Sequence, residues 1–337
     1  MENSRLLFAC KVYRRPFRIP VRTSQGLWEA REGIFLRIED ENGRVAFGEI
    51  APIERFGSET VAGALAWCAT IGAQTERSRI QPVPRTLPCC AWAVASALHA
   101  LEPAEPAGSP AGAKLAVCAL LPTGKAALAH LEQHAGDGFT TFKTKIGAAE
   151  FATEVEMIER LVDNLPSGAR LRLDANGALD VRSAIRWLDR AQSWPVEFIE
   201  QPLAVDARRE MIALAHDHGV PMAIDEAVRT ADDVKRWRDG GWPGIFIIKP
   251  ALAGDPLGWM PEVALDPRQF VFSSALETEI GTVAGLRQAL SSGSTRAVGY
   301  GVGTFFEDDG LGGGAGAPEI DVEAVSRRNL EEVWKRI

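Results

Sequence analysis

Short apolar runs alternate with helix-like segments along most of the chain after residue 113. Between the runs, apolar residues recur with the spacing of a helix, for example after the predicted capping residue Asp180. Eight of the runs predict strands: Leu115–Leu121, Thr141–Ile146, Leu171–Ala175, Glu197–Glu200, Met222–Asp225, Ile245–Lys249, Phe270–Ser274 and Ala297–Tyr300. This alternation predicts an α/β fold, namely a (β/α)8 barrel of the TIM type. A doubly wound sheet is the alternative, but the first run lacks the glycine-rich turn that binds dinucleotides.

The residues before this alternation show a different pattern. Apolar runs at Gly33–Arg37 and Arg44–Ile50 flank Asn42-Gly43, which predicts a β-hairpin in an antiparallel sheet. Alanine-rich helical segments follow at Glu59–Ile71 and Ala91–Leu101, before a connector rich in proline, alanine and glycine at Pro103–Pro110. We therefore expect an α+β capping domain, a barrel domain and a segment that returns to the cap, over residues 1–108, 109–305 and 306–337.

Residues Arg18–Glu29 belong to the expected cap but show little periodicity. The segment contains several polar residues, one proline and the large aromatic residue Trp28. This composition predicts a surface loop, and we expect it to serve as a lid that brings Trp28 to the substrate.

Ionisable residues stand at the ends of five consecutive predicted strands, one β/α unit apart. In chain order they are Lys143 and Lys145, Asp174, Glu200, Asp225 and Lys249. Active sites of β/α barrels lie at the carboxyl ends of the strands, so we expect these side chains at one level of the barrel. A single carboxylate at a strand end is more often a helix cap or a surface group, but the recurrence in consecutive units favours a site.

Three of these residues, Asp174, Glu200 and Asp225, are carboxylates on adjacent predicted strands. Their mutual repulsion would raise their pKa values unless a hard divalent cation neutralised them. The sequence therefore predicts a magnesium site. Glu226 is also a suitable ligand by type, but alternation along the strand turns it toward the helices, which favours Asp225.

The lysines predict the chemistry at this metal. Lys143 and Lys145 are two residues apart and share one face of a strand, so each would lower the pKa of the other toward that of a usable base. On their own they would equally fit a solvated strand face or a phosphate clamp. Lys249 follows the sixth strand, opposite the second in a ring of eight, so a metal-bound carboxylate would lie between opposed amines. A metal-free Schiff-base aldolase is disfavoured by the three carboxylates.

Composition restricts the partners. The 337 residues carry a net charge of -8 with a pI near 5.3, which argues against nucleic acid or an anionic membrane as the main partner. No run of 18 apolar residues occurs, so we expect a cytoplasmic enzyme that acts on a small carboxylate. The five cysteines are odd in number and lack metal-ligand spacing, which predicts buried thiols. Nothing in the sequence indicates the oligomeric state.

The strand-end motifs together resemble those of the enolase superfamily, in its muconate-lactonising-type branch. They are Lys143-Thr144-Lys145, Asp174-Ala175-Asn176, Glu200-Gln201-Pro202, Asp225-Glu226 and Lys249. Further stretches resemble o-succinylbenzoate synthases, notably Arg14-Arg15-Pro16-Phe17, Gly48-Glu49-Ile50-Ala51-Pro52, Phe56-Gly57-Ser58-Glu59 and Ser273-Ser274-Ala275-Leu276-Glu277-Thr278. The resemblance covers nearly the whole chain and implies a modified barrel behind an N-terminal capping domain.

The resemblance implies a magnesium-dependent dehydration of 2-succinyl-6-hydroxy-2,4-cyclohexadiene-1-carboxylate to o-succinylbenzoate, a step of menaquinone or phylloquinone biosynthesis. Lys145 would remove the proton α to the carboxylate and return it to the departing hydroxide, while Mg²⁺, with Mn²⁺ as a substitute, stabilises the ene-diolate. Lys249 would support the ring electrostatically, and Lys143 would tune Lys145. Asn176 would lie beside the metal ligands.

The distal, succinyl carboxylate of such a substrate also needs a binding site. Candidates are the hydroxyl groups of Ser273 and Ser274 and backbone N–H groups at Gly299, Gly301 and Gly303, because glycine lets the backbone approach an anion closely.

Two other functions remain open. An opposed pair of lysines equally suits a dipeptide epimerase or an N-acylamino acid racemase of the same superfamily. Epimerases tend to hold the substrate ammonium with an acidic pair after the last strand, and Glu307-Asp308-Asp309 departs from the usual Asp-x-Asp form. A non-catalytic, metal-stabilised barrel scaffold is a remote alternative, because a scaffold would not require opposed lysines.

Overall fold

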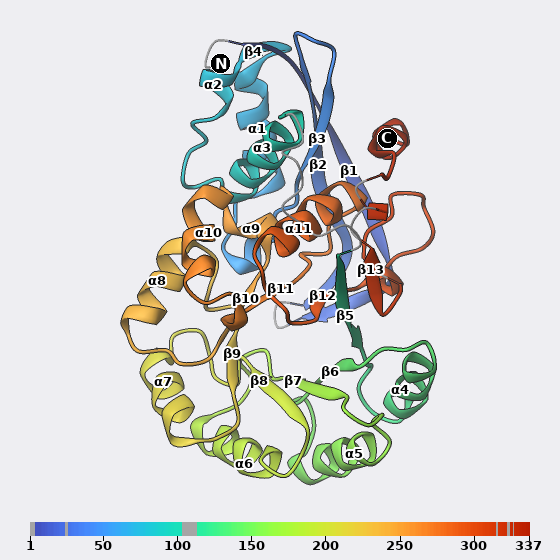
Figure 1. Ribbon diagram of the computed structural model, residues 1–337, viewed down its shortest axis with the longest axis vertical. Helices are drawn as coiled ribbons and strands as arrows, with labels where there is room; N and C mark the ends of the chain where they lie inside the picture. The colour runs from blue at the N-terminus through green and yellow to red at the C-terminus, as the bar shows by residue number, and fades with distance from the viewer. Residues whose placement is uncertain (1–3, 24–25, 103–112, 315, 322–323, 326) are drawn as a thin grey trace.

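The computed structural model describes residues 4–23, 26–102, 113–314, 316–321, 324–325 and 327–337. In this part of the chain the capping domain lies above the barrel in the view of Figure 1. None of the described helices has the length and apolar character needed to cross a bilayer. The five cysteines are free thiols, and four of them are buried; Cys10 is half-buried.

Eight parallel strands of the described chain form the barrel. They are β5 (Lys114–Leu120), β6 (Thr141–Lys145), β7 (Arg170–Asp174), β8 (Val196–Glu200), β9 (Met222–Ile224), β10 (Ile245–Ile248), β11 (Phe270–Phe272) and β12 (Val298–Gly301). Neighbours in the chain pair with one another, and β12 returns to pair with β5. A parallel bridge between Ser273 and Gly299 links β11 to β12, so the ring is nearly closed. The predicted barrel is confirmed.

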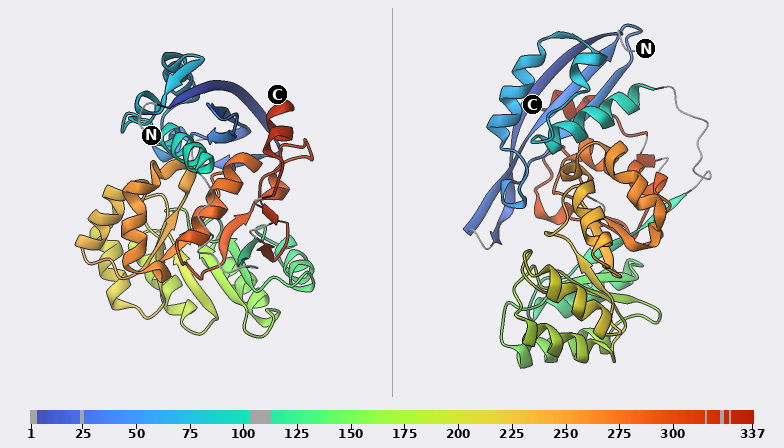
Figure 2. Two further views of the ribbon diagram at one scale, coloured as in Figure 1. Left: turned by 45° about the horizontal axis from the view of Figure 1, so that its top comes forward. Right: turned by 90° about the vertical axis from the view of Figure 1, so that its left-hand side faces the viewer.

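Helices follow the strands around the outside of the barrel (Figure 2). They are α4 (Ala126–Gly136), α5 (Phe151–Asp163), α6 (Val181–Ala191), α7 (Arg208–Asp217), α8 (Ala231–Asp239), α9 (Pro250–Ala253), α10 (Pro256–Leu265) and α11 (Glu279–Ser291). The side chain of Asp180 accepts a hydrogen bond from the Ser183 N–H and caps α6, as predicted. Thr230 and Asp233 form a capping box that starts α8.

An antiparallel sheet forms the capping domain. Its strands lie in the order β3 (Val45–Ile50), β2 (Gly26–Asp40), β1 (Arg5–Thr23) and β4 (Gln74–Glu76), with helices α1 (Val61–Ile71), α2 (Arg77–Ile80) and α3 (Pro88–Leu101). The predicted hairpin at Asn42-Gly43 is confirmed, with Gly43 at φ 76° between β2 and β3. The predicted boundary in Pro103–Pro110 lies outside the described residues, and the domain limits 1–108, 109–305 and 306–337 remain our proposal.

The prediction of a loop at Arg18–Glu29 is wrong for the described residues. Strands β1 and β2 continue through this segment as a long hairpin, in which Val21 pairs with Trp28; residues 24–25 lie outside the description. The register shifts between Pro16 and Val21, where proline cannot donate to the ladder. This irregularity obscured the strand pattern in the sequence. A role as a lid remains a prediction.

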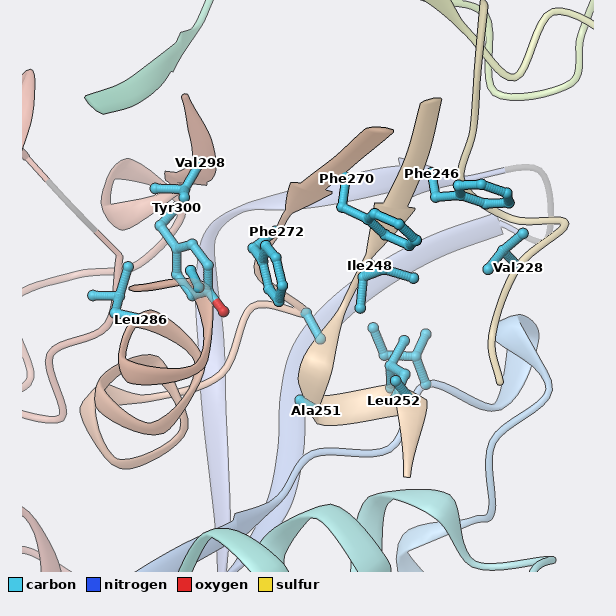
Figure 3. Close-up of a cluster of buried hydrophobic side chains, with 14 of the residues drawn as sticks. Val228, Phe246, Ile248, Ala251, Leu252, Phe270, Phe272, Leu286, Val298 and Tyr300 are labelled. Atoms are coloured by element: carbon cyan, nitrogen blue, oxygen red, sulfur yellow. The ribbon is translucent and has the colours of Figure 1, made fainter. Parts of the chain in front are cut away.

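Aromatic side chains of β10 and β11 pack against the surrounding helices, and a chain of ring contacts continues from there into the cap. Figure 3 shows Phe246 and Phe270 side by side, and their rings stack at 5.1 Å. From Phe272 the contacts lead to Trp259 of α10 at 6.0 Å and on to Trp92 of α3 at 6.5 Å. The barrel and the cap therefore share one core, and each fully buried aromatic ring contributes roughly 2–3 kcal/mol to it.

A buried carboxylate joins the cap to the amino-terminal end of α11. Glu49 of β3 accepts hydrogen bonds from the Tyr13 hydroxyl at 2.6 Å, the Thr278 hydroxyl at 2.6 Å and the Gly281 N–H at 2.9 Å. A negative charge at a helix amino terminus satisfies N–H groups that lack partners and opposes the positive end of the helix dipole. This side chain therefore helps to fix the orientation of the cap on the barrel.

The last described helix, α13 (Leu330–Lys335), lies against the cap sheet rather than the barrel strands. Trp334 packs against Phe47 at 6.1 Å between ring centroids, in a small core that also contains Tyr13 and Phe35. The Lys11 ammonium group donates hydrogen bonds to the carbonyl groups of Trp334 and Ile337. The helix α13 thus packs on the sheet that the first strands of the chain form.

Glu277, next to this junction, gives a prediction about pH. Burial, with a further contribution from the Glu49 charge, raises the pKa of Glu277 from 4.5 to about 7, against hydrogen bonds from Ser274 and Ala275 that favour the anion. A carboxyl group whose pKa is raised by folding stabilises the fold below its unfolded pKa, and this contribution is lost as the pH rises through the folded pKa. We expect the free energy of unfolding to fall by about 3 kcal/mol from this group between about pH 4.5 and about pH 8.

Urea unfolding of the wild type and of Glu277→Gln at both pH values measures this contribution as a difference between the two proteins. The glutamine variant should lack that part of the slope. Equal slopes for the two proteins would contradict the prediction.

Candidate functional site

The structure places the predicted catalytic and metal-binding residues together at the carboxyl ends of the barrel strands. Lys145, Asp174 and Glu200 are register partners across β6, β7 and β8, so they stand at one level. Asp225 directly follows β9, and Lys249 directly follows β10. Because parallel pairing fixes this level, the even spacing of these residues in the sequence becomes one ring of charges.

Ammonium groups lie directly against the carboxylates. The Lys143 Nζ is 2.8 Å from Asp174 Oδ2 and 2.6 Å from Glu200 Oε1. Lys249 forms an ion pair with Asp225. Both lysines are largely buried, and the three carboxylates are buried. Charges taken out of water in this way persist only when they are paired.

The pKa shifts follow from this crowding. Burial and the negative charge of Asp174 raise the pKa of Glu200 to about 8, although Lys143 opposes the shift. Burial also acts to raise the pKa of Asp174, but the Lys143 ion pair outweighs it and the net shift is downward. For Lys143 the expectation of a lowered pKa is wrong. Burial acts in that direction, but the surrounding carboxylates hold the pKa well above its usual value.

The donor set fits a hard divalent cation by its chemistry. Asp174, Glu200 and Asp225 offer only oxygen ligands, and the raised pKa of Glu200 shows that positive charge is needed there. As placed in the described chain, no three histidine, cysteine or acidic side chains stand close enough together to hold a metal ion. Instead the Lys143 and Lys249 ammonium groups supply the positive charge in this arrangement.

Asn176 connects the ends of two strands. At φ 45° it adopts the left-handed conformation; its backbone N–H donates to Asp174 Oδ1 at 3.0 Å, and its side chain donates to Glu226 Oε1 at 3.0 Å. The Glu226 Oε2 atom is buried and has no hydrogen-bond partner among the described residues. Burial and the charge of Asp225 raise the pKa of Glu226 to about 7. Asn176 thus orients Asp174, and its place beside metal ligands remains a prediction.

Sequence reasoning missed the role of Gln201. This residue is completely buried, and its Oε1 atom accepts hydrogen bonds from the N–H groups of Asp225 at 3.1 Å and Ala227 at 3.3 Å. It therefore ties the end of β8 to the end of β9 and fixes the position of Asp225. The position of Gln201 directly after Glu200 was the one feature of the sequence that could have indicated this role.

A turn of the cap reaches the barrel lysine on β10. The 3-10 helix η1 (Glu54–Phe56) places the Phe56 ring 4.8 Å from the Lys249 Nζ, a cation–π contact. The Arg229 side chain donates to the Phe56 carbonyl at 3.1 Å. Gly57, at φ 80°, ends the turn, and a side chain there would collide with Arg229. The cap thus contributes Phe56 to the site, a contact that was not predicted from the sequence.

The cavities agree with this position. A cavity of about 10 Å³ is lined by Asp225, Lys249 and Phe56. A neighbouring cavity of about 250 Å³ shares Phe56 and Arg229 with it but contains none of the predicted site residues. A larger cavity of about 760 Å³ lies elsewhere at the junction, between α3 and α11, and contains none of the predicted site residues. We assign the predicted chemistry to the first of these cavities, because Asp225 and Lys249 line it.

The two serines predicted to bind the distal carboxylate already donate hydrogen bonds within the protein. Ser274 is buried, and its hydroxyl donates to Glu277 at 2.9 Å, so it already has an anionic partner. The Ser273 hydroxyl donates to the Gly299 carbonyl at 3.3 Å. Gly299 and Gly301 need to be small for packing, because side chains would collide with Ser273 and with the Cys118 carbonyl. Close packing of the strands therefore accounts for glycine at both positions, and a bound anion is not needed to explain it.

Trp28 lies on the hairpin, half-buried against the Phe17 ring at 4.9 Å. The Arg55 guanidinium group of η1 also packs on the Trp28 ring, with its central carbon 3.7 Å from the ring centroid. Trp28 therefore contributes a platform above the barrel.

The acidic run after the last barrel strand binds the cap. Asp309 accepts two hydrogen bonds from the Arg15 guanidinium, at 2.7 and 2.8 Å, and Arg15 is almost completely buried. Glu307 lies 3.1 Å from Arg18 in an exposed ion pair. A forked arginine–carboxylate pair is a strong and directional contact. Two of these three acidic residues thus have cationic partners in this chain.

Comparisons with known proteins agree with this geometry. The family model described as "Enolase C-terminal domain-like" matches residues 126–264. An o-succinylbenzoate synthase from Thermosynechococcus vestitus is 39% identical over 87% of this chain and 91% of its own length. A crystal structure of o-succinylbenzoate synthase from Thermosynechococcus elongatus, complexed with Mg in the active site, is similar with a TM-score of 0.83 and 34% identity, over 98% of this chain and 100% of that one. A hydrophobic dipeptide epimerase from Roseobacter litoralis is 30% identical over 64% of this chain and 67% of its length.

The choice of Asp225 over Glu226 can be tested by metal binding. Asp225→Asn keeps the size of the side chain but removes one of three converging charges, so we expect the Mg²⁺ affinity to fall at least about tenfold. Glu226→Gln is the matched control and should change the affinity less than about threefold. Isothermal titration with Mg²⁺ measures both, and thermal unfolding checks that the variants fold. A larger loss for Glu226→Gln would reverse the assignment.

Proposed function

We propose a mechanism for this chain from the premise that it belongs to the o-succinylbenzoate synthases of the enolase superfamily. It is a carbon–oxygen lyase that forms o-succinylbenzoate. The substrate is then 2-succinyl-6-hydroxy-2,4-cyclohexadiene-1-carboxylate, and the reaction removes water from it. We place this step in the biosynthesis of menaquinone or phylloquinone, in the cytoplasm.

One observation supports Lys145 as the base: the three lysines of the site differ in their partners. Lys143 and Lys249 lie in ion pairs with buried carboxylates, so their side-chain nitrogen atoms are already engaged. Lys145 is exposed, and in the described part of the chain it has no ion pair or hydrogen bond. A general base must reach the substrate proton, and of the three lysines only Lys145 is not held by a carboxylate.

The proton transfers then balance around Lys145. Its neutral amine removes the proton α to the ring carboxylate, and the electron pair of that C–H bond moves into the ring. The C–O bond to the hydroxyl group breaks, and the oxygen leaves with its electron pair. The Lys145 ammonium group returns the proton to it as water. The ring becomes aromatic, so the protein has to supply less of the driving force than in a racemisation.

The remaining residues hold the negative charge that develops on the ring carboxylate. We propose that Asp174, Glu200 and Asp225 bind Mg²⁺, with Mn²⁺ as a substitute, because their donor set is all oxygen. When bound, this ion supplies positive charge opposite the substrate carboxylate. Lys249 supports the ring as a fixed cation, and Lys143 holds two of the carboxylates in place. Charges fixed in advance in a buried site need no reorganisation during the reaction.

The acidic run argues against a dipeptide epimerase. Such an enzyme needs carboxylates near the last strand that can accept the substrate ammonium. Here Asp309 is held by the fork of Arg15, and Glu307 faces Arg18. An acidic residue already paired with a guanidinium offers little attraction to a second cation.

Turnover tests the assignment of the base. Lys145→Ala should lower the rate of o-succinylbenzoate formation at least about a thousandfold, because no other amine of the site can accept the proton. Lys235→Ala, at an exposed position on α8, is the control and should keep full activity. Exhaustive chelation should abolish turnover, and Mg²⁺ should restore it. Substantial activity of Lys145→Ala would remove Lys145 from the mechanism.

Proton exchange in heavy water tests the alternative reaction. With N-acyl amino acids or dipeptides, the wild-type protein should exchange the α-proton more slowly than it dehydrates the cyclohexadiene. Mass spectrometry of each enantiomer measures the exchange. Faster exchange in both enantiomers, lost from one enantiomer in each of Lys145→Ala and Lys249→Ala, would identify an epimerase or racemase instead.

A further inference from the structure

Arg55 is a half-buried cation without an anionic partner. It lies in η1 of the cap, and its guanidinium carbon stacks 3.7 Å from the centroid of the Trp28 ring. Within the described residues no carboxylate lies within ion-pair distance of Arg55, and no group accepts a hydrogen bond from it. Stacking fixes the plane of a guanidinium but leaves its N–H donors available at the edge. These donors are therefore free for a ligand.

A second arginine increases the positive charge at this position. Arg31 is completely buried, and it donates to the carbonyl groups of Pro52 at 2.6 Å and Ala275 at 3.2 Å. Its guanidinium lies 5.7 Å from the same Trp28 ring. Burial and the charge of Arg31 lower the pKa of Arg55, which means that the two cations repel each other without compensation from the protein. An anion at Arg55 would relieve this repulsion.

The position of the pair relates it to the reacting centre. Arg55 precedes Phe56, whose ring contacts Lys249 at the end of β10. Arg31 contacts Ala275, which follows the end of β11. The two arginines thus stand on the cap side of the barrel mouth, above the ends of β10 and β11. The carboxylates Asp174 and Glu200 lie on β7 and β8, farther around the ring.

The proposed substrate carries two carboxylates, one on the ring and one at the end of the succinyl chain. The ring carboxylate belongs at the metal ligands, and the succinyl chain leads away from it. We propose that Arg55, stacked on Trp28, binds the distal carboxylate of the substrate through its free N–H donors. This inference rests on the proposed function, and it makes Arg55 a specificity-determining residue of the cap. Hydrogen bonds from guanidinium to carboxylate are directional, and the fork accepts both oxygens.

The product and its analogue without the distal carboxylate provide the test. Isothermal titration in the presence of Mg²⁺ compares o-succinylbenzoate with 2-butyrylbenzoate, which has the same ring and a chain of the same length. We expect the wild type to prefer the diacid at least about tenfold, as one charge-assisted contact provides. Arg55→Met keeps an apolar side chain on Trp28 but removes the charge. It should weaken the binding of the diacid alone and so reduce the preference below about threefold. Arg55→Lys should retain part of it.

Arg14→Met is the matched control, because it removes the same charge from an exposed residue of the cap, on β1. It should leave the preference unchanged. Retention of the full preference by Arg55→Met, or a wild type that does not bind the diacid more tightly than the analogue, would overturn the inference. A wild type that shows the Arg55 effect in binding but does not turn over the cyclohexadiene would instead refute the proposed function and leave the anion site in place.

Discussion

The burial of three like charges at one level of the barrel is the constraint on which the site depends. Asp174, Glu200 and Asp225 cannot all be ionised in a dry interior without positive charge between them. In the barrel, Lys143 and Lys249 supply this positive charge from the second and sixth strands of the ring. The lysines to which we assign roles in the reaction therefore also offset the cost of burying the carboxylates. Removing one partner would leave an uncompensated buried charge, which typically costs about 3–5 kcal/mol.

The cap also contributes to the site, because its residues cover the carboxyl ends of the barrel strands. Phe56 covers Lys249, and Trp28 with Arg55 forms the wall toward β11. Both segments are held from outside the cap, Phe56 by Arg229 and the hairpin by the Phe306 strand bridge. Specificity can therefore change through contacts of the cap while the charges of the barrel stay fixed, which is the usual division of labour in barrel enzymes.

The barrel and the location of its charges could be predicted because both follow from short-range periodicity. Each strand is a local apolar run, and Asp174 or Glu200 is simply its last polar residue. What depends on distant contacts could not be predicted. The raised pKa of Lys143 depends on Asp174 and on Glu200, which is 57 residues away. The ion pair of Asp309 depends on Arg15, which is 294 residues away. The hairpin at Arg18–Glu29 was not predicted, because proline interrupts the alternating pattern from which strands are predicted.

The contact between Lys11 and the helix α13 has a consequence for biosynthesis. The two partners are 323 residues apart, so at about 5–20 residues per second the ribosome needs on the order of 15–60 s between them. During this time β1 and β2 can pair, but the face that carries Tyr13 and Phe35 lacks its cover of Val333 and Trp334. A nascent chain would expose this apolar face until α13 has been synthesised, so the cap sheet acquires its full cover long after its own strands have formed.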